Sequence, residues 1–140
     1  DGQRIGIIGF CMGGRITWLA AASDPRFKAA VPYYGGNLMI TWGASHQTPF
    51  EMTANIQCPI LFHFGELDEN PSANDKLNLD AQLTRLNKPH QFYTYPDSDH
   101  AFMDYTGPRY NKVASQMSWS RTLGFFSVHL AKGGTAVGSV

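Results

Sequence analysis

The sequence lacks a long hydrophobic run. No stretch of 18 consecutive apolar residues occurs in its 140 residues, and no basic segment followed by an apolar one opens it. It also has little charge, because charged residues make up 16% and eleven Lys and Arg balance eleven Asp and Glu. We therefore expect no membrane span and no basic surface for binding nucleic acid.

Cysteine is scarce as well. The two cysteines do not form a disulfide framework, and no CxxC or paired Cys/His spacing predicts structural zinc. We expect no metal site and no cofactor. Low cysteine use favours a reducing, cytoplasmic setting.

Material for a folded core is abundant. Hydrophobic residues make up 43% and aromatic residues 13%, which argues against disorder, and the length suits one domain. We expect residues 1–140 to belong to a single domain whose last residues, 132–140, form a flexible tail rich in glycine and small side chains.

Four short apolar runs alternate with helix-like stretches, which is typical of a parallel sheet covered by helices. The predicted fold class is therefore α/β. The first run is apolar on both faces, as in a strand buried between helix layers. The four predicted strands are residues 4–10, 29–34, 59–64 and 91–95.

Three helices are expected between and after these strands. The first follows Gly13-Gly14, and the second is capped by Ser72 with Asp75 three residues on. A last helix is expected from Pro108. Its predicted core-facing stripe is Trp119, Leu123, Phe126 and Leu130.

The strongest chemical signal is the segment Gly9-Phe10-Cys11-Met12-Gly13-Gly14, which lies between a strand and a helix. It has the nucleophile-elbow pattern G-x-Nuc-x-G with cysteine as the nucleophile. Glycines are needed there because the turn is sharp and a Cβ atom would collide with the strand or the helix. The helix N-terminus favours a thiolate and offers N–H groups to an oxyanion. The alternative is that Cys11 is a small buried core residue.

A thiol nucleophile needs a base and a residue that orients the base. Asp68 follows the third strand and His100 follows the fourth, which is the order nucleophile, acid, base. The alternatives are a turn residue for Asp68 and an exposed loop histidine for His100. Asp97 and Asp99 are too close to His100 in sequence to reach its ring from the far side.

The sequence resembles the dienelactone hydrolase family of α/β-hydrolases over roughly residues 4–130. The elbow at residues 9–14 and the His100-Ala101-Phe102 segment carry the resemblance. Further matching elements are Tyr33-Tyr34-Gly35, Phe62-His63-Phe64-Gly65 leading to Asp68, and the late residues Tyr110, Ala114, Trp119, Arg121 and Phe125-Phe126.

The resemblance implies a hydrolase of esters or lactones that uses a Cys-His-Asp triad and a thioester acyl-enzyme. Cys11 would be the nucleophile, His100 the base and Asp68 its orienting acid. The backbone N–H of Met12 would bind the oxyanion. Candidate substrate-binding residues are Tyr33, Tyr34, Trp42 and Phe102. The alternatives are a glutaminase-type or DJ-like cysteine hydrolase and a non-catalytic or inactive hydrolase-fold fragment.

Two departures from the family pattern lead to further expectations. Family members that open dienelactones carry an arginine four residues after the catalytic histidine, where this sequence has Asp104, so we expect a preference for neutral substrates. The family also has strands before the elbow, which supply one oxyanion donor, and this chain begins at Asp1 without them. We expect the chain alone to be inactive, and to self-associate or require complementation by an N-terminal half.

Overall fold

The computed structural model describes residues 1–132, so most of the predicted flexible tail lies outside the described residues. Its elements, in chain order, are β1 (Ile5–Phe10), α1 (Met12–Ser23), β2 (Phe27–Tyr33), the 3-10 helix η1 (Glu51–Asn55), β3 (Ile60–Gly65), α2 (Ala73–Arg85), β4 (His90–Tyr95) and α3 (Lys112–His129). Within the described residues, no helix is both long and apolar enough to span a membrane.

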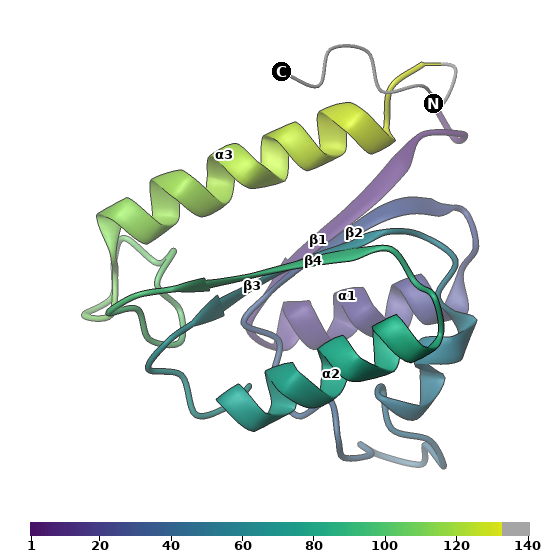
Figure 1. Ribbon diagram of the computed structural model, residues 1–140, viewed down its shortest axis with the longest axis horizontal. Coiled ribbons are helices and arrows are strands. Elements are labelled where there is room, and N and C mark those ends of the chain that lie inside the picture. The colour runs from purple at the N-terminus through teal and green to yellow at the C-terminus, as the bar shows by residue number, and fades with distance from the viewer. Residues whose placement is uncertain (133–140) are drawn as a thin grey trace.

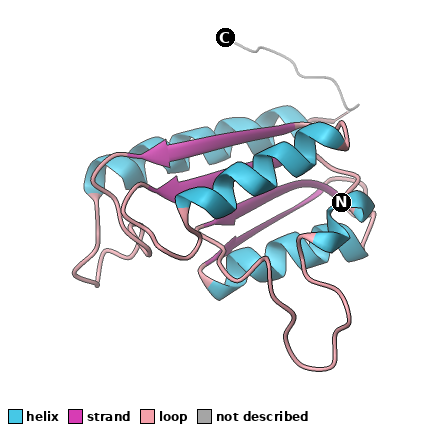
Figure 2. Ribbon diagram, turned by 60° about the horizontal axis from the view of Figure 1, so that its bottom comes forward, coloured by secondary structure: helices cyan, strands magenta, loops and turns pink. Residues whose placement is uncertain are grey.

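The four strands form one parallel sheet in the order β1-β2-β3-β4, and Figure 2 shows the four arrows pointing the same way. The predicted α/β class and parallel sheet are therefore confirmed. Within residues 1–132, the outer edge of β1 pairs with no other strand. All four strands end on the same side of the molecule, where ligands bind in open α/β sheets.

Helices cover both faces of the sheet (Figure 1). Helices α1 and α2 lie on one face, where Trp18 and Leu79 pack with strand residues such as Phe62. Helix α3 lies on the other face, where its Phe125 belongs to the cluster that contains Leu61. Adjacent residues of β3, such as Leu61 and Phe62, pack into clusters on opposite faces of the sheet because side chains alternate along a strand.

The start of α2 has the predicted cap. The Asp75 N–H donates to the Ser72 hydroxyl at 3.0 Å, and the Ser72 N–H donates to the Asp75 carboxylate at 2.9 Å. This capping box satisfies two N–H groups that the helix cannot pair internally. It also fixes where α2 begins, only a few residues after Asp68.

The prediction for the last helix was wrong in two respects. Helix α3 begins at Lys112, after an Asn111 cap, because residues 104–110 form turns. Phe126 and Leu130 of the predicted stripe pack against the core, but Trp119 and Leu123 are 44% and 54% exposed, and the buried face consists largely of small and polar residues. Buried serine and threonine are stable here because they hydrogen-bond to the sheet and loops, as Ser115 does with the Phe102 carbonyl.

Candidate active site

The predicted nucleophile lies in a strained turn directly after β1. Cys11 caps α1 with φ of 56° and ψ of −121°, a conformation that a residue with a Cβ atom rarely adopts. Its N–H donates to the Tyr33 carbonyl at 3.1 Å, while its own carbonyl accepts from the N–H of Gly14 at 2.9 Å. The turn therefore holds the thiol at the carboxyl end of the sheet.

Glycine is required on both sides of this turn. A Cβ atom on Gly9 would lie 2.1 Å from the Gly13 carbonyl oxygen. A Cβ atom on Gly14 would lie 2.7 Å from the Tyr33 carbonyl oxygen and 2.8 Å from the Gly35 Cα. These distances are shorter than any real Cβ contact, so the glycines allow α1 to start directly against the ends of β1 and β2.

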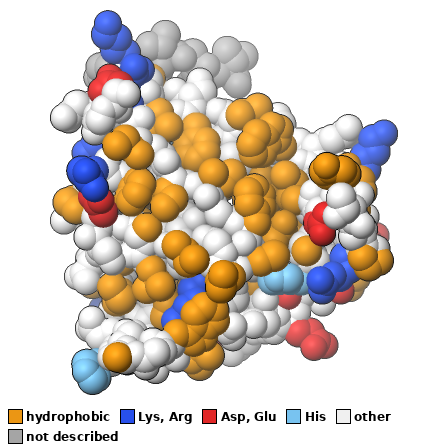
Figure 3. All heavy atoms as spheres, turned by 180° about the vertical axis from the view of Figure 1, so that it is seen from behind, with side chains coloured by type: hydrophobic (Ala, Val, Ile, Leu, Met, Phe, Trp, Pro, Cys, Tyr) orange, Lys and Arg blue, Asp and Glu red, His pale blue; other side chains and the backbone are white. Residues whose placement is uncertain are grey.

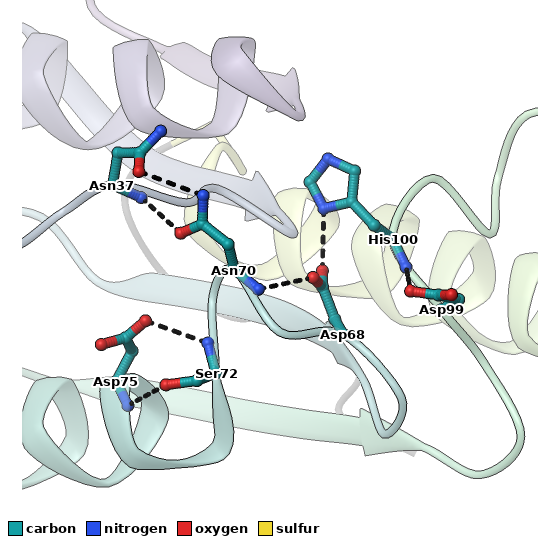
Figure 4. A network of polar contacts seen from close by, with 7 residues as sticks. All are labelled: Asn37, Asp68, Asn70, Ser72, Asp75, Asp99 and His100. Atoms are coloured by element: carbon teal, nitrogen blue, oxygen red, sulfur yellow. Dashed lines mark hydrogen bonds and ion pairs between the residues drawn. The ribbon is translucent and has the colours of Figure 1, made fainter.

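The structure brings the predicted acid and base together. The Nδ1 atom of His100 lies 2.8 Å from Oδ2 of Asp68, and the Asp68 side chain is almost fully buried (Figure 4). The N–H of Asn70 donates to the other carboxylate oxygen at 2.9 Å. The carboxylate of Asp68 can only accept a hydrogen bond from Nδ1 of His100, so a neutral imidazole carries its proton on Nδ1. The other ring nitrogen, Nε2, then has a lone pair with which it could act as a base.

The neighbouring acidic residue does not compete for this role. Asp99 accepts a hydrogen bond from the backbone N–H of His100 at 2.6 Å and thereby shapes the loop rather than orienting the ring. This is the outcome expected for an acid next to His100 in sequence. Of these two acids, Asp68 is the one whose carboxylate contacts the imidazole.

Cys11 and His100 have a common neighbour in Tyr34. The Tyr34 ring lies 5.1 Å from the imidazole between centroids, and Cys11 packs against the cluster that contains Tyr34. Within the described part of the chain, no hydrogen bond joins the thiol to His100. Catalytic hydrogen bonds often form fully only when substrate binds.

The environment of the thiol favours its protonated form. Burial raises the pKa of Cys11, the positive charge of Arg109 lowers it, and the charges of Asp68 and Asp104 raise it further. The net pKa lies above its ordinary value, although the dipole of α1 favours the thiolate. A base is therefore needed to remove the proton as the thiol reacts.

A cavity of about 540 Å³ opens beside the acid and the base. It is lined by Leu67, Asp68, Glu69, Asn70, Asp99, His100 and Arg109. Arg109 was not among the predicted site residues. It follows His100 by nine positions in a turn-rich loop, and nothing local in the sequence indicates that this loop folds back toward Cys11.

The four predicted substrate-binding residues differ in accessibility. Tyr33 and Phe102 are fully buried, and Tyr34 is 2% exposed. The Phe102 ring lies 5.1 Å from that of Tyr34, and the Tyr33 hydroxyl bonds to Thr122 at 2.9 Å, so both pack beneath Tyr34. Trp42 is partly exposed and stacks on the Arg15 guanidinium 4.0 Å away.

Met12 occupies the predicted oxyanion position. It is the first residue of α1, so its N–H has no partner within the helix. Among residues 1–132, no three His, Cys, Asp or Glu side chains are grouped so that they could hold a metal ion.

The parallel sheet, the turn at Cys11, and the acid and base on successive loops define an α/β-hydrolase fold. The dienelactone hydrolase family model matches residues 1–130, and the chain belongs to this family. A crystal structure of a "Putative Dienelactone Hydrolase" from Klebsiella pneumoniae superposes with a TM-score of 0.86 at 32% identity, covering 91% of this chain and 53% of that one.

Curated relatives agree with this assignment. A "Putative carboxymethylenebutenolidase" from Salmonella typhimurium is 34% identical over 134 residues, which are 96% of this chain and 50% of the relative. A "Probable 2-oxo-3-(5-oxofuran-2-ylidene)propanoate lactonase" from Bradyrhizobium sp is 29% identical over 91% of this chain and 52% of that protein. The chain thus spans about half the length of the curated relatives it matches.

Proposed function

We propose that the complete protein hydrolyses an ester or a lactone through a covalent thioester on Cys11. The observation that carries this proposal is the 2.8 Å contact between His100 and Asp68, at the same end of the sheet as the strained Cys11 turn. Membership of the dienelactone hydrolase family supports the same reaction class. The cysteine as nucleophile and the roles within the triad are part of the proposal.

In the first half of the reaction, Nε2 of His100 takes the thiol proton while Sγ of Cys11 attacks the carbonyl carbon. The Met12 N–H at the start of α1 stabilises the negative oxygen of the tetrahedral intermediate. The bond from carbon to the leaving oxygen then breaks, and that oxygen receives the proton from His100. Asp68 holds the imidazole in the required tautomer and stabilises its cation throughout.

In the second half, water releases the acid product. His100 takes a proton from water, and the resulting hydroxide attacks the thioester carbonyl. The bond from carbon to Sγ breaks, and Cys11 regains its proton from His100. The raised pKa of Cys11 is consistent with this sequence, because a neutral thiol must be deprotonated in each cycle.

For the substrate we propose a neutral ester or lactone. The cavity is lined by three acidic residues, Asp68, Glu69 and Asp99, against the single cation Arg109. Asp104 stands four residues after His100, where the family members that open dienelactones carry an arginine. Like charges at close range disfavour a carboxylate-bearing substrate. Of the four candidate substrate-binding residues, Trp42 is the proposed contact because it alone is exposed, whereas Tyr33, Tyr34 and Phe102 are buried and Tyr34 packs against the His100 ring.

Two other functions fit the structure less well. A glutaminase-type or DJ-like cysteine hydrolase holds its histidine and acid in one short stretch, whereas Asp68 and His100 come from separate loops. In a non-catalytic protein, the strained backbone of Cys11 and the buried carboxylate of Asp68 would lower stability with no compensating function. Both observations favour the ester or lactone hydrolase.

The proposal is tested by the hydrolysis of a neutral aryl ester and of a lactone by the full-length protein and its Cys11→Ala variant. We expect turnover of at least one substrate and its loss in the variant. A carboxylate-bearing lactone and its methyl ester then test substrate charge, and the methyl ester should have the higher kcat/KM. A variant as active as the wild type would refute the nucleophile, and a strong preference for the carboxylate would refute the neutral site.

We further propose that these 140 residues need a second half for activity. The residues of β1 are partly exposed along its unpaired edge, and Phe10 is 39% exposed. On the side of β1, hydrophobic side chains cover much of the surface (Figure 3). The outward residues Trp119 and Leu123 of α3 add to the exposed apolar area. Such an edge and apolar surface attract another strand and helix, from the same polypeptide or another copy.

A further inference from the structure

The loops after β2 and β3 are joined by a pair of side-chain amides. The backbone N–H of Asn37 donates to Oδ1 of Asn70 at 2.9 Å, and Nδ2 of Asn70 donates to Oδ1 of Asn37 at 3.1 Å (Figure 4). The two residues are 33 positions apart in sequence. Their hydrogen bonds form a closed ring between the loops, so each loop restrains the other.

This amide pair connects directly to the catalytic acid. The N–H of Asn70 donates to Oδ1 of Asp68 at 2.9 Å, while Oδ2 of the same carboxylate holds the imidazole of His100. The two oxygens therefore have one partner each. A displacement of Asn70 would release Oδ1 and let the carboxylate rotate, which changes the direction in which it holds His100.

The other side of the pair connects to the nucleophile's helix. Arg15 lies in the first turn of α1 and is 3% exposed. Its Nη1 donates to the carbonyl of Asn37, and to that of Ile40 at 3.1 Å. A continuous polar chain thus runs from the helix that begins beside Cys11 through Asn37 and Asn70 to Asp68.

We propose that Asn37 and Asn70 are positioning residues that fix the Asp68 carboxylate, and through it His100, relative to the Cys11 turn. This inference rests on the proposed function for its kinetic consequence only. Asn37 is suited to its place because it adopts φ of 56°, which asparagine tolerates better than most residues. Gly36 is also suited, because a Cβ atom there would lie 2.6 Å from Oδ1 of Asn70 and displace its amide.

Three variants of the full-length protein break the pair in different ways. Asn70→Ala removes both side-chain bonds, and Asn37→Gly keeps the backbone donor and the positive φ but removes one acceptor. Gly36→Ala leaves both asparagines in place and pushes the Asn70 amide aside. We expect kcat to fall about fivefold to tenfold in Asn70→Ala and less in Asn37→Gly, with KM changed less than twofold, since one net hydrogen bond corresponds to roughly a fivefold effect.

Two comparisons separate positioning from a general loss of stability. Asn37→Asp retains the acceptor for Nδ2 of Asn70 and should restore most of kcat, whereas Asn87→Gly alters another asparagine with positive φ, at the end of α2, and should leave kcat unchanged. The double variant Asn37→Gly/Asn70→Ala should be no slower than Asn70→Ala, because Asn37 acts through Asn70.

A spectroscopic readout does not depend on the nucleophile. In the wild type we expect a downfield proton resonance for Nδ1–H of His100, assigned by its loss in His100→Gln. It should move upfield or broaden in Asn70→Ala and Gly36→Ala, and it should stay at its wild-type position in Asn37→Asp. Wild-type kcat and an unchanged resonance in Asn70→Ala and Gly36→Ala would overturn the proposal. If the resonance shifts as expected while Cys11→Ala remains active, the proposed function fails and the positioning role holds.

Discussion

At the scale of single residues, the site combines a thiol that is hard to ionise with an imidazole held by a buried carboxylate. Burial and the charges of Asp68 and Asp104 raise the pKa of Cys11, and the positive charge of Arg109 lowers it. In the proposed reaction, deprotonation of the thiol is therefore coupled to its attack on the substrate, and the orientation of His100 determines how efficient that coupling is. Asp68 and Arg109 are the two residues whose replacement tests this view.

Replacing Asp68 by Asn should lower kcat by roughly 100-fold or more, because an amide in place of the carboxylate favours the wrong imidazole tautomer and no longer stabilises the imidazolium. Steady-state kinetics of the full-length protein measure the effect. The matched control is Asp97→Asn, which replaces an exposed acid close to His100 in sequence. An equal fall of kcat in both variants would mean that the negative charge near His100, and not the contact with Asp68, determines the rate.

The pH dependence of Cys11 alkylation follows from its raised pKa. The rate of reaction with iodoacetamide should be low near pH 7 and should continue to rise above pH 9, because only the thiolate reacts. Removal of the positive charge in Arg109→Gln raises the thiol pKa further, so the rate at pH 8 should fall roughly twofold to fivefold. Mass spectrometry of the Cys11 peptide gives the rate.

The control for this measurement is Arg26→Gln. Arg26 lies directly before β2, at the other end of the sheet, and is paired with Asp24. It should leave the alkylation profile of Cys11 unchanged. A profile that levels off below pH 9 in the wild type would show that the thiol is more acidic than its burial implies.

At the scale of elements, the close contact between α1 and the segment after β2 fixes the position of the Cys11 turn. The Cα of Gly14 faces the Gly35 backbone so closely that no side chain fits between them. The dipole and free N–H groups of α1 depend on this approach for their direction toward the site. The contact should therefore be sensitive to a single methyl group.

Gly14→Ala should lower the free energy of unfolding by about 2 to 4 kcal/mol, because the new Cβ atom meets rigid backbone. Gly13→Ala is the matched control one residue away, since its Cβ atom would meet nothing within 4 Å. It should leave stability unchanged or raise it by up to about 1 kcal/mol, because alanine favours helix. Denaturant unfolding compares the two, and similar losses in both would contradict a specific α1–β2 contact.

How much of this could be predicted from sequence depends on how local each feature is. The strands, the Cys11 turn and the Ser72 cap are encoded by neighbouring residues, and their predictions were confirmed. The buried face of α3 was not predictable in this way, because Thr122 is buried through hydrogen bonds to Tyr33 and His63, which are 89 and 59 positions away. The Asn37–Asn70 pair was not predictable from neighbouring residues either, because it joins two loops whose residues are 33 positions apart.

At the scale of the whole molecule, the outer edge of β1 pairs with no other strand within residues 1–132, and apolar side chains such as Phe10 are partly exposed beside it. The 140-residue chain alone should therefore associate or aggregate, and should show no esterase activity. Sedimentation velocity and an aryl ester assay test both points. Addition of the proposed second half as a separate polypeptide should reduce the association and restore turnover, whereas a well-behaved, fully active monomer would contradict the proposal that a second half is needed.

The central claim is that Cys11 carries the acyl group during hydrolysis. The most direct measurement is acid quenching of the full-length protein during turnover of an activated ester, followed by peptide mapping by mass spectrometry. The account predicts an acyl mass on the peptide that contains Cys11, and its absence in Cys11→Ala. Hydrolysis that proceeds with no adduct on Cys11, or with the adduct on another residue, would contradict it.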